Sequence, residues 1–394
     1  MPVLPLHAID VSLDIEMQTR TFFSDGVFNN QPDVEQGAGL QPSLAISPEL
    51  RWHYDDQQVV FVGFARWNDD WADADAERNH ADIRELYYTS RFDTDRYGEW
   101  ELLVGINKVF WGVTESVHLI DIINQTDLIE DIDGEDKLGQ PSIQLATQRD
   151  WGRVELFVLP YFRERTLAGT DGRFRFALPV NHDNAQYESD RKQQHVDWAL
   201  RYAHYFGNVD IGLSFFDGTS REPLFVLSDR TSQLIPFYEQ MTQFGLDLQW
   251  TQDAWLWKLE ALYRDASSDD FIAAVGGFEY TFFQITPAGS DLGLLLEYQY
   301  DARTAAAPIT IADDDVFTGV RWALNDAVDT SVLAGIVVDV NQGTRFWNIE
   351  AERRLGNNWF IEGRLRAFTH TEADELEAAF ADDDYLQVSA TYYF

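Results

Sequence analysis

The sequence predicts an all-β fold, a single closed antiparallel barrel of about 18 strands that crosses a membrane, with about 16 strands as the alternative count. Apolar and polar residues alternate with a period of two along most of the chain, which is typical of strands. Short turns alternate with long polar segments, as in membrane barrels. Aromatic residues gather at the strand ends, where a barrel in lipid meets its two interfaces with water.

The composition limits the classes of protein to consider. The 394 residues carry a formal net charge of −38, and 14% of them are aromatic. Disordered acidic chains are poor in aromatic residues, so we expect a folded protein. The strong negative charge argues against nucleic acid as a partner. The sequence has no cysteine, so it offers no disulfide framework and no thiolate chemistry.

The hydropathy pattern favours spanning strands over spanning helices. No run of about 18 apolar residues occurs, so we expect no transmembrane helix, whereas a spanning strand needs only about 9–11 alternating residues. No linker or change of periodicity divides the chain, so residues 9–394 are predicted to form one barrel domain. Residues 1–8, "MPVLPLHA", are interpreted as the remnant of a secretory signal, with cleavage before Ile9.

The first predicted strand illustrates the two faces. Its apolar face carries Ile9, Val11, Leu13, Ile15 and Met17, and its polar face carries Asp10, Ser12, Asp14, Glu16 and Gln18. In a soluble sandwich the apolar face would form the core. In a barrel embedded in lipid, the apolar face points outward and the acidic face inward.

The same alternation recurs to the end of the chain. The predicted strands are 9–22, 43–54, 59–67, 82–92, 99–111, 142–149, 153–162, 195–206, 209–216, 239–251, 255–263, 271–284, 292–300, 315–324, 330–340, 344–354, 359–369 and 385–394. Long segments between them lie at 24–42, 68–81, 112–141, 163–194, 217–238, 301–314 and 370–384, with brief links at 264–270 and 341–343 as exceptions. An even number of strands lets the first pair with the last, which removes both sheet edges.

Aromatic residues provide a second test of the barrel. On the short-turn side they are Trp52, Tyr54, Trp100, Phe206, Trp250, Trp255, Phe282, Trp322, Trp359 and Phe394; on the long-loop side they are Trp67, Phe110, Phe162, Phe215, Tyr263 and Tyr300. A soluble sandwich has no need to sort aromatic residues in this way. The distribution therefore favours a barrel with aromatic girdles at two interfaces.

The last strand carries a resemblance to a known family. "QVSATYYF" resembles the C-terminal signal of Gram-negative outer-membrane β-barrel proteins, with Gln387, Ser389, Tyr392 and Phe394 at its positions and Ser389 where glycine is usual. The resemblance implies a porin-like bacterial outer-membrane protein with short periplasmic turns and long extracellular loops. It implies outer-membrane lipid, lipopolysaccharide and the barrel-assembly machinery as partners, and it leaves a homotrimer open.

The inward positions are strongly ionic. We expect a wet or densely paired interior, because unpaired charges in a dry one would be very unfavourable. Arg321, Arg354, Arg364 and Arg366 are predicted to form a basic wall that faces acids across the lumen. The alternative is local pairing of the arginines with the acids Glu350, Glu352 and Glu362, since opposite charges commonly pair across strands.

The segment 112–141 is the third long connection and too long for a tight turn. In porins the third long loop folds into the lumen, so we expect an inward constriction loop with Glu115, Asp121 and Asp127 as a selectivity gate. The alternatives are an outward cap over the barrel mouth or a contact with a neighbouring subunit, because loop direction is not encoded in periodicity.

Other chemistry is weakly indicated. Asp131, Asp133 and Asp136 resemble half of a calcium loop but lack the glutamate at its twelfth position. Ser116 and His118 stand two apart and would point away from each other on a helix, so we expect no hydrolase. No paired histidine ligands and no nucleotide motif occur, so we expect neither an enzyme nor a cofactor.

These observations predict a channel for passive diffusion of small hydrophilic solutes, which we expect to be charged. The acidic excess favours cations or zwitterions, although a basic constriction would select anions. The alternative is a loop-plugged receptor, adhesin or assembly component without conductance.

Overall fold

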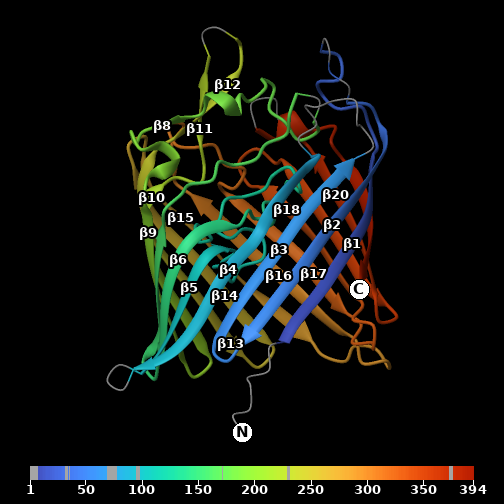
Figure 1. The fold of residues 1–394 in the computed structure, drawn as a ribbon. Coiled ribbons are helices and arrows are strands. Elements are labelled where there is room, and N and C mark those ends of the chain that lie inside the picture. Colours follow the sequence, from blue (N-terminus) through green and yellow to red (C-terminus); the bar gives the residue numbers. More distant parts are fainter. Residues whose placement is uncertain are drawn as a thin grey trace.

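The chain forms one closed barrel. The computed structural model describes residues 8–31, 34, 36–68, 78–94, 98–170, 172–228, 231–371 and 376–394. Eighteen strands belong to a single sheet, and β1 (Ala8–Phe22) pairs with β21 (Tyr385–Tyr393) to close it (Figure 1). The predicted fold class and the count of 18 strands are confirmed. Residues 1–7 of the expected signal remnant lie outside the described residues.

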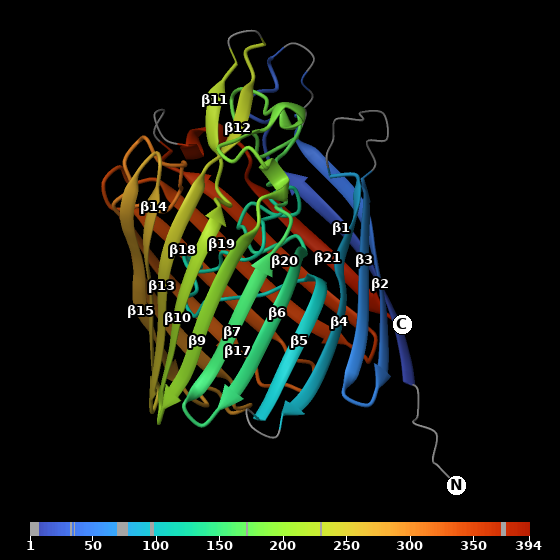
Figure 2. The same cartoon turned by 60° about the vertical axis from the view of Figure 1, so that its left-hand side comes forward.

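Each barrel strand pairs antiparallel with its neighbours, and each predicted strand has its counterpart. The strands between β1 and β21 are β2 (Gly39–Tyr54), β3 (Gln57–Asn68), β4 (His80–Thr94), β5 (Gly98–Asn107), β6 (Gln140–Arg149), β7 (Gly152–Leu159), β9 (Asp197–Phe206), β10 (Val209–Thr219), β13 (Gln240–Gln252), β14 (Trp255–Ala266), β15 (Asp270–Phe282), β16 (Asp291–Asp301), β17 (Asp315–Ala323), β18 (Ser331–Asp339), β19 (Arg345–Leu355) and β20 (Trp359–Thr369). The long connections gather at one end of the barrel and the short turns at the other (Figures 1 and 2).

The two faces of each strand differ in polarity, because successive side chains point to opposite sides of the sheet. In β21 the exposed residues Leu386 and Val388 alternate with the buried residues Tyr385, Gln387 and Ser389. The exposed large apolar residues of the other strands, such as Leu213 and Ile272, occupy the same outer face. The outside of the barrel is therefore apolar and the inside polar.

Two residues predicted for the aromatic girdles lie elsewhere, because β5 and β7 end earlier than expected. Phe110 follows the end of β5 at Asn107 and belongs to the connection that enters the barrel. Phe162 follows the end of β7 at Leu159 and is buried, with its ring centroid 4.8 Å from that of Tyr238.

A small second sheet escaped prediction because it lies in segments that were expected to be polar loops. It contains β8 (Gln186–Tyr187), β11 (Leu224–Leu227) and β12 (Leu234–Tyr238), and it stands beyond the long-loop end (Figure 2). Among the residues that the structure describes, short 3-10 turns lie at His182–Asn184, Lys192–Gln194 and Leu376–Phe380. Within the described part of the chain, no helix is long and apolar enough to cross a membrane.

Residues 108–139, which join β5 to β6 and are called the inner loop below, lie inside the barrel (Figures 1 and 2). The loop has its own apolar anchor, because its residues Trp111, Ile120, Ile122 and Ile123 are buried. They pack on inward residues of four barrel strands, Phe157, Leu159, Ala199, Phe216 and Met241. Burying this apolar surface against the wall favours the inward course of the loop.

Candidate functional site

The first half of the inner loop is held by two glutamates on the barrel wall. Glu260 of β14 accepts hydrogen bonds at Oε1 from the backbone N–H of Val113 (2.7 Å) and of Thr114 (3.0 Å), and from Thr114 Oγ1 (2.7 Å). Its Oε2 accepts the N–H of Ile120 at 3.3 Å. Because hydrogen bonds to an ionised acceptor are strong, this carboxylate fixes two separate points of the loop.

Glu297 of β16 holds the residues that follow. Its two carboxylate oxygens accept the backbone N–H of Glu115 (2.9 Å) and of Ser116 (2.8 Å), and Ser116 Oγ donates to it at 2.7 Å. His118 instead lies near Glu260, with 3.9 Å between His118 Nδ1 and Glu260 Oε1. Ser116 and His118 therefore have different carboxylate partners.

The side chain of Glu115 is paired as firmly as its backbone. Arg321 Nη2 of β17 lies 2.6 Å from Glu115 Oε2, and Lys258 Nζ of β14 lies 3.6 Å from the same oxygen. Arg321 also approaches Glu279, at 3.6 Å. Glu115, predicted to belong to the loop gate, and Arg321, predicted to belong to the wall opposite that gate, are thus direct neighbours.

The second half of the inner loop contacts a different sector of the wall. Asp127 is fully buried and lies 2.6 Å from Arg84 Nη2 of β4. Glu130 lies 2.8 Å from Arg66 Nη2 of β3. The loop therefore reaches from the wall at β14 to β17 across to the wall at β3 and β4.

The same half also contacts β1, β20 and β21. Asp131 is 3.8 Å from Arg20 and 3.0 Å from Arg364, and it accepts a hydrogen bond from the Tyr385 hydroxyl at 2.9 Å. Asp133 is 2.9 Å from Arg366, which is fully buried. Arg20, Arg364 and Arg366 therefore offset the negative charges of Asp131 and Asp133.

Arg364 and Arg366 also pair locally, as the alternative interpretation of the sequence had it. Arg364 contacts Glu362 on its own strand, and Arg366 lies 2.6 Å from Glu350 on β19. Arg354 is elsewhere: it stands close to the short-turn end of β19, half-exposed, 3.2 Å from Asp329. The structure therefore brings Arg321, Arg364 and Arg366 to the inner loop and leaves Arg354 away from it.

Asp121 binds within the loop itself. Its carboxylate lies 3.3 Å from Lys137 and accepts the backbone N–H of Trp111 at 3.2 Å. Burial raises the pKa of Asp121 above its ordinary value, although Lys137 lowers it. Asp121 thus joins the two ends of the loop and is hidden from the lumen.

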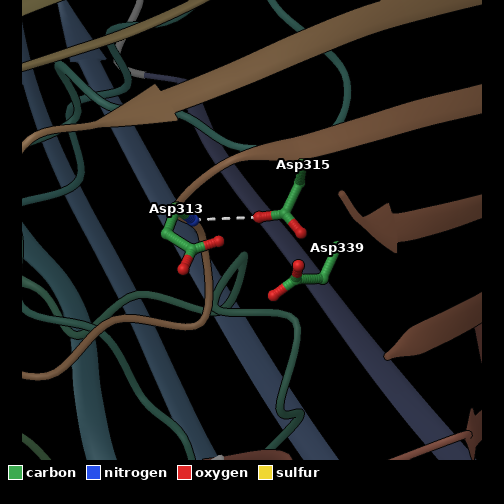
Figure 3. Close-up of side chains that lie close together, drawn as sticks. All are labelled: Asp313, Asp315 and Asp339. Carbon is green, nitrogen blue, oxygen red and sulfur yellow. Dashed lines mark hydrogen bonds between the residues drawn. The ribbon is translucent and has the colours of Figure 1, made fainter. Parts of the chain in front are cut away.

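The weak calcium candidate is not assembled. Asp131 and Asp133 each bind an arginine, and they do not converge with Asp136 on one point. Among the described residues, the carboxylates that do converge are Asp313, Asp315 and Asp339, at the long-loop ends of β17 and β18 (Figure 3). No sequence motif marked this group, because Asp339 comes from the neighbouring strand.

The electrostatic environment of the inner loop shifts the pKa values of its carboxyl groups in different directions. Burial and the neighbouring charge of Asp131 raise the pKa of Asp133 to about 7. Burial, with Glu130 and Asp131, raises the pKa of Asp136 to about 6. Burial acts in the same direction on Asp131, but Arg20, Arg366 and Arg364 hold its pKa well below the ordinary value.

Three basic residues of the site, Arg20, Arg66 and Arg84, were not predicted. Arg66 stands at an inward position near the long-loop end of β3, which is the signal that sequence patterning offered. Arg84 is harder to assign, because a β-bulge interrupts the alternation there. Val62 of β3 lies opposite Glu85 and Gly63 lies opposite Ile83, so Arg84 is the extra residue of β4.

The comparisons with known proteins agree with this architecture. No protein-family model and no curated protein matches the chain. A BenF-like porin from Pseudomonas fluorescens Pf-5 superposes with a TM-score of 0.53 at 11% sequence identity, covering 98% of each chain. OccAB3 from Acinetobacter baumannii superposes with a TM-score of 0.52 at 9% identity, covering 98% of this chain and 99% of that one. At these identities the likeness establishes the fold.

Proposed function

We propose that the protein is a bacterial outer-membrane channel through which small hydrophilic solutes diffuse passively. The observation that carries the proposal is the inversion of polarity in a closed barrel: apolar residues cover the outside, while charged residues line the inside around an inward loop. A barrel in lipid needs this arrangement, because closure leaves no unpaired strand edge in the hydrocarbon. The porin fold of the two structural neighbours supports it.

The surfaces of the barrel also indicate which partners surround it in the membrane. The apolar outer face suits outer-membrane lipid, and the loops beyond the long-loop end suit contact with lipopolysaccharide. Gln387, Ser389, Tyr392 and Phe394 serve as the signal read by the barrel-assembly machinery; in the structure the rings of Tyr392 and Phe394 meet edge to face on the outer face, with 4.6 Å between their centroids. A homotrimer is the assembly we propose to test.

The charges around the inner loop favour cations or zwitterions as solutes. Five arginines around the inner loop each contact two carboxylates: Arg66 contacts Glu16 and Glu130, Arg84 contacts Asp82 and Asp127, Arg321 contacts Glu115 and Glu279, Arg364 contacts Asp131 and Glu362, and Arg366 contacts Asp133 and Glu350. The arginines are thus matched or exceeded by acids. Negative charge left over in a narrow passage raises the local concentration of cations.

One observation favours a second candidate function, a receptor whose interior is filled by its loops. The inner loop contacts strands on widely separated sectors of the wall, β14 to β17 and β20 to β4. A barrel crossed in this way offers less room for solutes than an empty one. Transport measurements separate the two candidates.

Swelling of proteoliposomes tests the proposal. Vesicles that contain the refolded protein are diluted into iso-osmotic solutions of a small sugar, a cationic amino acid or an anionic amino acid. We expect swelling with all three, fastest with the cation. Vesicles that do not swell, although the protein shows the heat-modifiable gel migration of a folded barrel, would favour the plugged receptor.

A further inference from the structure

The connection between β7 and β9 crosses the long-loop mouth of the barrel. Its described residues 163–170 and 172–175 are called the mouth strap. Counted along the sheet order, β7 stands six strands from β1, and β9 stands eight strands from β21. The tip of the strap nevertheless contacts the loop that joins β1 to β2 and the loop that joins β20 to β21, so it spans a large part of the mouth.

Arg173 makes the contacts that hold the tip. Its Nε donates to Asp383 Oδ1 at 2.5 Å, and its Nη1 donates to the carbonyl oxygen of Gln36 at 2.9 Å. Its Nη2 donates to the carbonyl oxygens of Asp382 (2.9 Å) and Ser24 (3.1 Å). One guanidinium group therefore joins three loops that are distant in sequence.

The site around Arg173 is enclosed. The side chain of Arg173 is 3% exposed and that of Asp383 is 4% exposed. The guanidinium carbon lies 4.1 Å from the ring centroid of Phe22, the last residue of β1. Phe174 packs its ring 5.4 Å from Tyr385, and its N–H donates to Asp383 Oδ2 at 3.1 Å. The tip is thus docked by packing as well as by charge.

The strap is also fixed at its beginning and in the middle. Arg163 forms a two-pronged ion pair with Asp82 of β4, with Nη2 at 2.9 Å and Nη1 at 3.2 Å from the carboxylate oxygens. Thr166 Oγ1 donates to Asp127 of the inner loop at 2.6 Å. The strap therefore passes directly over the second half of the inner loop, and Arg173 is its far attachment.

We infer that Arg173 is a positioning residue that keeps the mouth strap across the entrance and thereby sets the largest solute the channel admits. The inference rests on the proposed channel function. Arginine suits this role because its planar guanidinium group offers five donors in a fixed geometry, which one carboxylate and three carbonyl oxygens can satisfy together. Lysine offers a single ammonium group and cannot reach the same set of acceptors from one position.

Solute size provides the first test. Proteoliposome swelling is measured with a series of saccharides from mono- to tetrasaccharide for the wild type, Arg173→Ala and Arg191→Ala. Arg191 is an exposed arginine of the same connection and is the matched control. We expect Arg173→Ala to raise the swelling rate several-fold for the larger saccharides and to leave the smallest unchanged. An unaltered size limit in Arg173→Ala overturns the inference.

Proteolysis provides a second test that does not need conductance. Trypsin cleaves after arginine, so a docked tip protects Arg173 in the wild type. Asp383→Asn keeps Arg173 but removes the charge of its partner, and we expect cleavage after Arg173 to appear in that variant. Rapid cleavage after Arg173 in the wild type overturns the docking of the strap. Wild-type vesicles that fail to swell would reject the channel, while protease protection would still report the docking.

Discussion

Glu115 and Arg321 form an ion pair inside the barrel, 2.6 Å apart, although 206 positions separate them in the sequence. Glu115 belongs to the inner loop and Arg321 to the wall strand β17. The backbone of Glu115 is held at the same time by Glu297. The charge of Glu115 is therefore fixed in space, and we propose that it contributes to the selectivity of the channel.

Replacing Glu115 with glutamine should weaken cation selectivity. The substitution keeps the size of the side chain but removes its negative charge. The positive charges of Arg321 and Lys258 are then no longer compensated by Glu115, so the local electrostatic potential becomes more positive. We expect the reversal potential in a KCl gradient to shift toward the equilibrium potential of chloride. Asp329→Asn is the control, since it removes one charge at the short-turn end beside Arg354. An equal shift in both variants would mean that Glu115 has no special place in the ion path.

Replacing Glu260 with glutamine should loosen the inner loop. A glutamine amide supplies one acceptor oxygen and turns donor hydrogens toward at least one of the loop N–H groups that Glu260 now accepts. Leaving a buried donor unsatisfied costs about 1–3 kcal/mol. We expect added noise in single-channel recordings and faster hydrogen exchange of the Val113, Thr114 and Ile120 amides. Exchange as slow as in the wild type would contradict the clamp.

A disulfide tests the same clamp in the opposite direction. A Cβ placed on Gly245 would lie 3.4 Å from Ile120 Cβ, near the range that disulfides require, provided that the Ser214 hydroxyl rotates away. The sequence has no other cysteine to compete. We expect Ile120→Cys with Gly245→Cys to form a disulfide and to restore quiet recordings when it is combined with Glu260→Gln. Continued noise after confirmed oxidation would place its source outside the inner loop.

The pH dependence should follow Asp133 and Asp136. Their pKa values of about 7 and about 6 lie above the ordinary 3.8, so in the folded protein both groups take up protons as the pH falls from 8 to 5. The lumen then loses negative charge, and we expect cation selectivity to decline over this interval. Because the folded state binds more protons than the unfolded state between about pH 4 and 7, these groups favour folding at low pH, and this contribution is lost as the pH rises through 6 to 7.

The control for the pH dependence is the pair of substitutions Asp133→Asn and Asp136→Asn. We expect this variant to have a selectivity that no longer changes between pH 8 and 5. A transition of undiminished size would assign the titration to other carboxyl groups.

Removing Arg66 should destabilise the inner loop. Arg66→Ala leaves the buried carboxylate of Glu130 without its main partner, and breaking a buried pair costs about 3–5 kcal/mol. We expect a lower temperature for the loss of heat-modifiable gel migration. Arg66→Ala combined with Glu130→Ala should recover part of the loss. If the double variant is no more stable than the single one, the pair does not support the loop.

The strands were predictable and the loop contacts were not, for a physical reason. The side chains of a strand alternate between its two faces, so alternation alone placed 359–369 as observed and 209–216 within the observed β10, Val209–Thr219. The height of a residue in the barrel depends instead on the tilt and stagger of strands. Arg354 and Arg366 share the inward face, yet Arg354 pairs near the short turns and Arg366 near the inner loop.

The inward course of the inner loop was expected from a resemblance and is explained by contacts that no local pattern reveals. Glu260 and Glu297 follow the ordinary alternation of their strands, and nothing nearby marks them as acceptors for loop amides. Arg173 lies in a segment read only as a long polar loop. Its partners, Asp383 and Gln36, are brought together by the closed barrel and by no feature of the local sequence.

The most direct test of the channel is the single-channel current across a planar bilayer that contains the refolded protein, with the reversal potential measured in a KCl gradient. We predict discrete steps of current and a reversal potential whose sign reports a preference for potassium over chloride. A silent bilayer, with the heat-modifiable migration of a folded barrel, would contradict the channel and leave the loop-filled receptor.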